Sequence, residues 1–177
     1  ETGAGICERD NIEVDIVNGT LAKAFGVQGG YIAGKREFID AIRSMASAFI
    51  FTTSLSPTIC AGALTSIKYV KDHPELREKL QERAKKTKEE IERQGIEVLK
   101  NDSHIVPVII GDPKKCKAVS DELLYKNGIY VQPINWPTVA RGTERLRFTP
   151  TPFHTDAHIF DMVVKLKSAL KRCGKKK

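Results

Sequence analysis

The chain has 177 residues, of which 41% are hydrophobic and 29% charged, a composition typical of folded globular proteins and not of disordered ones. No apolar stretch approaches the roughly 20 residues of a membrane helix, and no secretory signal is visible, so we expect neither a membrane span nor secretion. The net charge of +7 can indicate a nucleic-acid partner, but four basic residues fall in the last six and acidic residues are interleaved elsewhere, so we expect none.

The cysteines are spread along the whole chain and form no C-x-x-C pair. This spacing is typical neither of a zinc site nor of a disulfide framework, and it favours a reducing compartment. We therefore predict no metal site. The four residues are Cys7, Cys60, Cys116 and Cys173.

In the first part of the chain, short apolar runs alternate with helical periodicity. Strands are predicted over 14–17 and 31–33, and a third apolar run, rich in β-formers, covers 49–53. Helices are predicted over 36–47 and from about Pro57. Alternating strands and helices indicate an α/β arrangement.

Residues 74–94 carry the clearest helical pattern. Pro74 suits a first helical turn, and Gly95 suits the end. Because the helix is highly charged and its apolar stripe is thin, we predict a surface helix that connects two domains. Its predicted i,i+4 ion pairs are Glu75–Lys79, Glu82–Lys86 and Glu89–Arg93, and the predicted domain bounds are 1–73, 74–100 for the connection, and 101–177.

The second part of the chain alternates again. Strands are predicted over 105–110, 129–131 and 145–149, and helices over 114–126 and 155–172. We expect these elements to form a small α+β domain at the end of the chain.

Lys23 is the first candidate for chemistry. It lies among small residues and glycines in Asn18-Gly19-Thr20-Leu21-Ala22-Lys23-Ala24-Phe25-Gly26, just after a predicted strand. A lysine becomes a nucleophile near neutral pH only when its environment lowers its pKa, so by residue type alone a solvated surface lysine is the better interpretation. The nearby Gly29 and Gly34-Lys35 nearly match a phosphate-binding loop, but Arg36 replaces the Ser or Thr that binds magnesium, so we reject that site.

Two hydroxyl residues, Thr52 and Thr53, lie at the end of the third apolar run and precede the helix expected from Pro57. Hydroxyls and free backbone N–H groups at such a junction can bind a phosphate. The same residues are equally typical of a helix N-cap, so the pattern alone leaves both interpretations open.

Arginines follow the Pro-rich segment that begins at Gln132. On a strand, Arg145 and Arg147 lie on one face, with Leu146 and Phe148 on the other. A guanidinium held on a strand can bind a carboxylate with two parallel hydrogen bonds. From spacing alone, however, a surface ion pair is the better interpretation.

Together these stretches resemble the α-oxoamine synthase family of pyridoxal-phosphate enzymes, over nearly the whole chain. The matching stretches are 15–26, 29–33, 49–55, 103–107 and 130–152, of which the last is the most discriminating. The resemblance implies the end of the large domain of a fold-type I pyridoxal-phosphate transferase, followed by a small α+β domain.

The resemblance also implies roles for single residues. Lys23 would bind pyridoxal 5'-phosphate covalently and then act as the catalytic base, and Thr20 would bind the cofactor phosphate. Thr52 and Thr53 would reach the phosphate in the neighbouring subunit of a homodimer with shared sites. Arg147 would bind the glycine carboxylate, and Thr138 would lie in a loop that closes over the acyl-CoA.

The implied reaction joins glycine to succinyl-CoA and releases CoA and carbon dioxide, as the first step of haem biosynthesis. Alternatives are a synthase of the same family with another amino acid or acyl-CoA, or a non-catalytic basic binding domain. The family's pyridine-binding aspartate and ring-stacking histidine would lie upstream, so we expect this chain alone to be inactive. The resemblance implies a cytoplasmic protein in a bacterium and a mitochondrial-matrix protein in a eukaryote.

Overall fold

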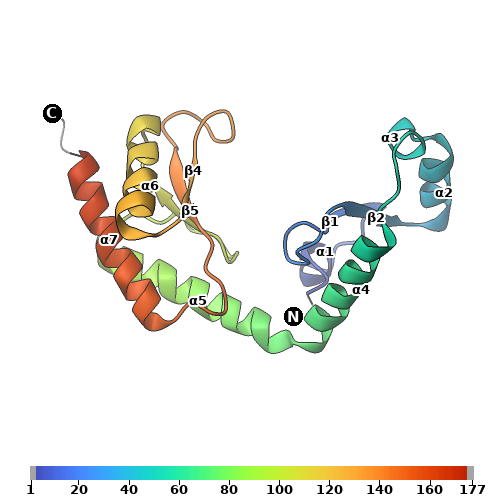
Figure 1. Cartoon of the computed structure of the whole chain (residues 1–177), viewed down its shortest axis with the longest axis horizontal. Helices are drawn as coiled ribbons and strands as arrows, with labels where there is room; N and C mark the ends of the chain where they lie inside the picture. The colour runs from blue at the N-terminus through green and yellow to red at the C-terminus, as the bar shows by residue number, and fades with distance from the viewer. Residues whose placement is uncertain (1–2, 175–177) are drawn as a thin grey trace. The chain divides into compact units, whose positions relative to one another are not determined.

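The computed structural model describes residues 3–174, which divide between Glu75 and Leu76 into two compact units. Figure 1 shows the order of their helices and strands along the chain. Within the described residues, none of the helices combines the length and apolar character needed to cross a membrane.

The first unit is built around an antiparallel hairpin of β1 and β2, in which Val17 lies opposite Ala33. Both strands confirm the predicted runs, with shifted ends, and the predicted helices over 36–47 and from Pro57 are also present. The elements are α1 (Ile6–Arg9), β1 (Ile16–Thr20), β2 (Gly30–Gly34), α2 (Arg36–Met45), α3 (Ser47–Ile50) and α4 (Pro57–Asp72).

The prediction of a strand-like run over 49–53 is wrong. The segment begins in the short helix α3, where the N–H groups of Phe49 and Ile50 both donate to the carbonyl of Ala46. A short apolar run does not distinguish a strand from a helical turn, and here the backbone groups are satisfied locally.

Few apolar side chains of the first unit are buried. Leu21 and Ala63 are the buried hydrophobic residues among 3–75, whereas Tyr31, Ile32 and Phe51 are among those that remain exposed. The described residues of this unit therefore do not enclose a core of their own.

The second unit is a three-stranded antiparallel sheet with α6 and α7 on one face (Figure 1). The strand order is β3-β5-β4, so β5 is central. This arrangement confirms the predicted small α+β unit. The elements are α5 (Pro74–Arg93), β3 (Val106–Ile109), α6 (Pro113–Asn127), β4 (Gln132–Ile134), β5 (Arg145–Phe148) and α7 (Asp156–Gly174).

One continuous core holds this unit together. Leu146 and Phe148 point from β5 into the core, where they pack with apolar residues of the helices such as Leu123 and Leu166. Leu123, Leu146 and Leu166 are fully buried, and each such side chain contributes about 1.5–3 kcal/mol relative to full exposure.

The third strand of the sheet lies at Gln132–Ile134, so the predicted strand over 129–131 is wrong. Pro133 would be unfavourable in the middle of a sheet, because proline cannot donate to a ladder. Among the residues that the structure describes, however, β4 is an edge strand that pairs only with β5. An edge strand tolerates a proline, because one of its sides needs no hydrogen bonds to a neighbour.

The charged helix α5 differs from the predicted surface connection. Ala84, Thr87 and Ile91 are buried, and Ile91 belongs to the core of the second unit. Whether 74–100 connect two domains of a whole protein stays a prediction.

Two of the predicted ion pairs of α5 are replaced by others. Arg83 and Lys86 both contact Asp156 at 2.5 Å, and Arg93 contacts Glu90 at 2.5 Å. The hydrogen bonds from Lys86 and Arg83 hold the pKa of the Asp156 carboxyl below its usual range. Lys86 therefore pairs with α7 instead of with Glu82, whereas Arg93 still pairs within α5 but with Glu90 instead of Glu89.

Candidate active site

Lys23 lies in the connection between β1 and β2. The N–H of Leu21 donates to the carbonyl of Gly29 at 2.9 Å, and the N–H of Val27 donates to the carbonyl of Leu21 at 3.1 Å. A turn within this connection is closed by the bond from the N–H of Gly26 to the carbonyl of Lys23, at 3.1 Å. The backbone of residues 21–29 thus forms a closed loop, and Lys23 is the first residue of the turn within it.

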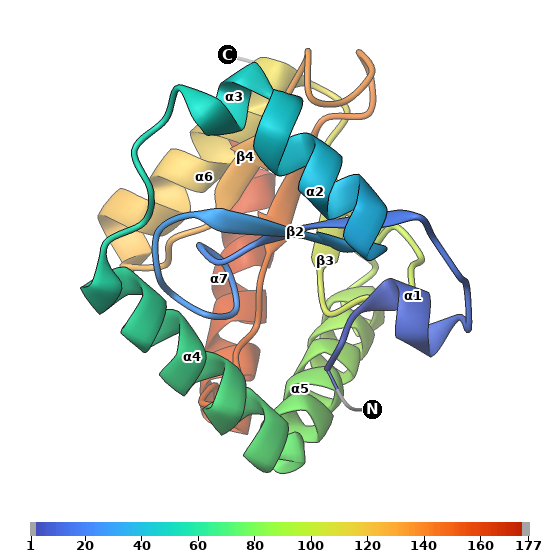
Figure 2. The same ribbon diagram turned by 90° about the vertical axis from the view of Figure 1, so that its right-hand side faces the viewer.

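Glycines are required for the close packing around this loop. Gly29 has a φ of 105°, and a Cβ added there would lie 2.9 Å from the side chain of Leu55. At Gly62 of α4, a Cβ would lie 3.2 Å from Val27 of the loop. Figure 2 shows α4 and the connection between β1 and β2 in the first unit. The loop therefore rests on α4 and on the segment before it.

Lys23 and Thr20 present reactive groups on this loop. Both side chains are exposed, and no ion pair of Lys23 is found within residues 3–174. The Thr20 hydroxyl oxygen accepts from the N–H of Ala22 at 3.3 Å, which leaves the hydroxyl hydrogen available to an anionic ligand. The loop thus offers an amine and a hydroxyl donor from one short segment.

Thr52 and Thr53 do not cap α4, so that interpretation is wrong. Ser56 is the N-cap, and its hydroxyl accepts from the N–H of Ile59 at 3.4 Å. The two threonines are exposed, and within the part of the chain described no hydrogen bond of their hydroxyls is found. They are therefore available to bind an external group.

Arg145 and Arg147 occupy the face of β5 opposite the core, as predicted. Arg147 lies between Pro107 of β3 and Gln132 of β4, and is exposed. Arg145 is partly buried, and its Nε donates to the carbonyl of Thr143 at 2.9 Å. The two arginines share a face, but only Arg145 is tied to the backbone by a hydrogen bond found here.

Thr138 lies in the loop that connects β4 to β5. It is exposed, and its N–H donates to the carbonyl of Asn135 at 3.0 Å. The guanidinium of Arg141 stacks 4.8 Å from the centre of the Trp136 ring. Buried Glu144 accepts from the N–H of Gly142 at 3.0 Å. Contacts within the loop thus give it a definite shape.

The predicted site residues fall into two groups. Lys23 and Thr20 share the loop of the first unit, while Arg147 and Thr138 belong to the second unit. Within the second unit, Thr138 follows the end of β4 that lies opposite Arg145, which is two residue pairs along the ladder from the pair formed by Arg147 and Gln132. The loop therefore emerges beside Arg145.

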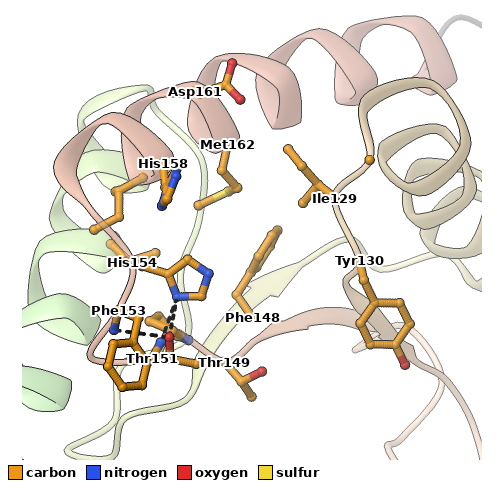
Figure 3. A pocket seen from close by; sticks show the side chains of 14 residues that line it. Ile129, Tyr130, Phe148, Thr149, Thr151, Phe153, His154, His158, Asp161 and Met162 are labelled. Carbon is orange, nitrogen blue, oxygen red and sulfur yellow. Dashed lines mark hydrogen bonds between the residues drawn. The ribbon is translucent and has the colours of Figure 1, made fainter. Parts of the chain in front are cut away.

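A hollow of about 610 Å³ in the second unit holds none of the predicted site residues (Figure 3). Phe148 lines it from the face of β5 opposite Arg147. The Nδ1 atom of His154 accepts from the N–H of Thr151 at 2.9 Å, so this imidazole stabilises the backbone of the turn before α7. Phe148 and Arg147 thus lie on opposite faces of β5, although Tyr130 lines the hollow and its hydroxyl bonds to Gln132.

The cysteines of the second unit are unsuited to nucleophilic chemistry. Burial raises the pKa of the Cys116 thiol to about 11, and burial also raises the pKa of Cys173. The thiolate is the reactive form of a thiol, so both shifts disfavour nucleophilic reaction of these side chains.

Sequence reasoning missed two residues beside Arg147. Gln132 lies directly opposite Arg147, and Tyr130 donates its hydroxyl hydrogen to Oε1 of Gln132 at 2.6 Å. The sequence of β4 has no alternation that could have placed Gln132 on this face, and the predicted strand over 129–131 ended before it. Buried Glu144 was also missed, and no sequence pattern distinguishes it from a surface glutamate.

A family model and curated relatives both match nearly the whole chain. The family model for class I and II aminotransferases matches residues 4–166. The 5-aminolevulinate synthase of Bradyrhizobium diazoefficiens is 51% identical over 174 residues, which are 97% of this chain and 42% of that protein. The 5-aminolevulinate synthase of Rickettsia felis is 54% identical over 166 residues, with 93% and 40% covered. The chain thus spans less than half the length of these relatives.

Solved structures of related enzymes share the fold of this chain. A serine palmitoyltransferase with PLP has a TM-score of 0.89 and 30% identity, and the match covers 98% of this chain and 44% of that one. The 8-amino-7-oxononanoate synthase of Francisella tularensis has a TM-score of 0.76 and 23% identity, with 89% and 46% covered, a likeness of fold alone. The predicted fold class and the resemblance to this group of enzymes are confirmed.

Proposed function

Since the chain belongs to the class I and II aminotransferase family, we propose that the whole protein condenses glycine with succinyl-CoA to give 5-aminolevulinate, CoA and carbon dioxide. The observation that carries this proposal is the identity of 50–54% with curated 5-aminolevulinate synthases over at least 91% of the chain. The product is the precursor of haem and other tetrapyrroles.

The residues of the first unit fit pyridoxal 5'-phosphate as the cofactor. Lys23 supplies an amine that is able to bind an aldehyde covalently, and Thr20 supplies a hydroxyl hydrogen for a phosphate oxygen. When bound, the cofactor withdraws electrons from the carbon that carries the amino group. The small residues around Lys23 leave room for a planar ring.

Side chains of this chain carry out proton removal, carboxylate binding and the exclusion of water. The Lys23 amine accepts the proton that leaves the glycine carbon. The Arg147 guanidinium binds the glycine carboxylate and orients it, first while the proton is removed and later while carbon dioxide leaves. The loop that carries Thr138 closes over the acyl-CoA and excludes water, which would otherwise hydrolyse the thioester.

The proposal is tested with the full-length protein, because this chain spans less than half the length of the curated relatives that it matches. We expect release of CoA and formation of 5-aminolevulinate with glycine and succinyl-CoA. Alanine, serine, or acetyl-CoA in place of one substrate should give much less product. Equal or greater turnover with another pair would assign the protein to a different α-oxoamine synthase. Absence of bound cofactor and of turnover with every pair would favour a non-catalytic binding domain.

Thr52 and Thr53 give a prediction about shared sites in a homodimer. A subunit with Thr52→Ala and Thr53→Ala still carries Lys23, whereas a subunit with Lys23→Ala still carries both threonines. Each heterodimer would then contain one intact site. Random mixing of two inactive variants should restore about a quarter of wild-type activity, because half of the dimers are mixed and each has one of two sites.

The measurement is turnover after the two variants have been co-expressed with different affinity tags and the mixed dimers purified, which should raise the activity from about a quarter to about half of the wild-type value per dimer. The doubly mutated threonine homodimer and the Lys23→Ala homodimer serve as controls. If purified heterodimers have no more activity than these controls, the threonines act within their own subunit or have no role in the site.

A further inference from the structure

Gln132 faces the same side of the sheet as Arg147. The two residues are directly opposite each other in the antiparallel pair of β4 and β5, and such partners lie on one face with Cβ atoms about 4.5–5.5 Å apart. Arg147 is exposed, and Gln132 is partly exposed at the edge of the sheet. A ligand that reaches the Arg147 guanidinium therefore also comes within reach of the Gln132 side chain.

The Gln132 amide is held in one orientation. Its oxygen, Oε1, accepts the hydroxyl hydrogen of Tyr130 at 2.6 Å, and its nitrogen, Nε2, donates to the carbonyl of Pro133 at 3.2 Å. An amide nitrogen carries two hydrogens, so one N–H of Gln132 remains for another acceptor. Tyr130 fixes which end of the amide is the donor.

The neighbours of Arg147 across the sheet carry no charge. On one side lies Pro107 and on the other lies Gln132, and no ion pair of Arg147 is found within residues 3–174. A glutamate at position 132 has almost the same shape but would form a cross-strand ion pair with Arg147. Gln132 thus forms no ion pair with the Arg147 guanidinium and adds an N–H donor beside it.

We propose that Gln132 is a substrate-binding residue, whose free Nε2–H donates to the amino-acid carboxylate that Arg147 binds. This inference rests on the proposed function, because it takes the carboxylate site of Arg147 as given. Tyr130 is a positioning residue for the amide. The ligand class is an α-amino acid, with its carboxylate shared between a guanidinium and an amide.

Two substitutions of Gln132 test two effects separately. One removes the Nε2–H donor, and the other places a negative charge beside Arg147. Gln132→Leu removes the donor, and we expect glycine binding to weaken by about tenfold, the loss of one hydrogen bond to a charged group. Gln132→Glu also neutralises Arg147, and we expect about a 10- to 100-fold weakening. The KM for succinyl-CoA and the midpoint of thermal unfolding should change little in both variants.

The measurement is titration of the cofactor absorbance with glycine in the full-length holoenzyme. Gln81→Glu, at an exposed position of α5, is the control for added charge and should match the wild type. The inference is overturned if both Gln132 variants bind glycine as tightly as the wild type, or if their glycine and succinyl-CoA constants change in parallel with the unfolding midpoint.

Arg147→Lys, measured alongside, distinguishes a failure of the role proposed for Gln132 from a failure of the carboxylate site proposed for Arg147. If Arg147→Lys weakens glycine binding and the Gln132 variants do not, only the role of Gln132 is lost. If Arg147→Lys leaves glycine binding unchanged, the carboxylate site of the proposed function is itself wrong.

Discussion

Lys23→Ala in the full-length protein is expected to abolish covalent attachment of pyridoxal phosphate and to reduce turnover by at least about 10³-fold. The first effect follows from the proposed role of Lys23 as the amine that binds the cofactor aldehyde. The second follows from its proposed role as the base for the glycine proton, because general-base catalysis alone contributes about 10²- to 10⁴-fold. Visible absorbance of the bound cofactor, its bleaching by borohydride, and the rate of CoA release measure the two effects.

Lys35→Ala is the matched control. Lys35 is also an exposed lysine and lies at the N-cap position of α2, just beyond β2. Its side chain makes no capping hydrogen bond, so its removal should leave both the cofactor absorbance and turnover near wild-type levels. Retention of borohydride-sensitive absorbance and turnover by Lys23→Ala would show that another residue carries the cofactor.

Arg147→Lys is expected to weaken glycine binding by tens-fold. Hydrogen bonds to a charged group are worth about 1.5–3 kcal/mol, against about 0–1 kcal/mol for an exposed ion pair, and each 1.4 kcal/mol is about tenfold in affinity. Lysine keeps the positive charge but lacks the planar fork that forms two parallel hydrogen bonds to a carboxylate. Glycine titration of the cofactor absorbance gives the dissociation constant.

Arg145→Lys serves as the control on the same face of β5. Because Arg145 is partly buried and its Nε donates to the carbonyl of Thr143, its guanidinium has a role within the loop. We expect its substitution to change glycine binding much less than Arg147→Lys. Small and equal changes at the two positions would mean that Arg147 is a solvated strand residue, and the substrate site would have to be sought elsewhere.

Local signals in the sequence predicted most helices of this chain. Pro57 and Pro113 lie at the first positions of α4 and α6, with Ser56 and Asp112 as their capping residues, and Gly128 ends α6 in the left-handed conformation. These signals are reliable because a helix satisfies its hydrogen bonds among residues close in sequence. The alternation of β5 was predicted for a similar reason, since side chains on a strand have a period of two.

The positions of the apolar segments in the first unit were less predictable. Phe49, Ile50 and Phe51 have the composition of a buried strand, but they form a short helix and a turn, and all three are exposed. Apolar composition shows only that a segment favours burial. Which conformation it adopts depends on the surfaces that cover it, and those are not encoded within the segment itself.

The sequence by itself determined the motif around Lys23, the prolines and glycines at the ends of the main helices and the common face of Arg145 and Arg147. Only the tertiary structure decided that Pro133 lies in an edge strand and that Gln132 faces Arg147. Strand register joins residues that are distant in sequence, and a shift of one residue turns every side chain to the other face. The neighbours of the proposed carboxylate site therefore depend on how β4 and β5 align, which no single segment specifies.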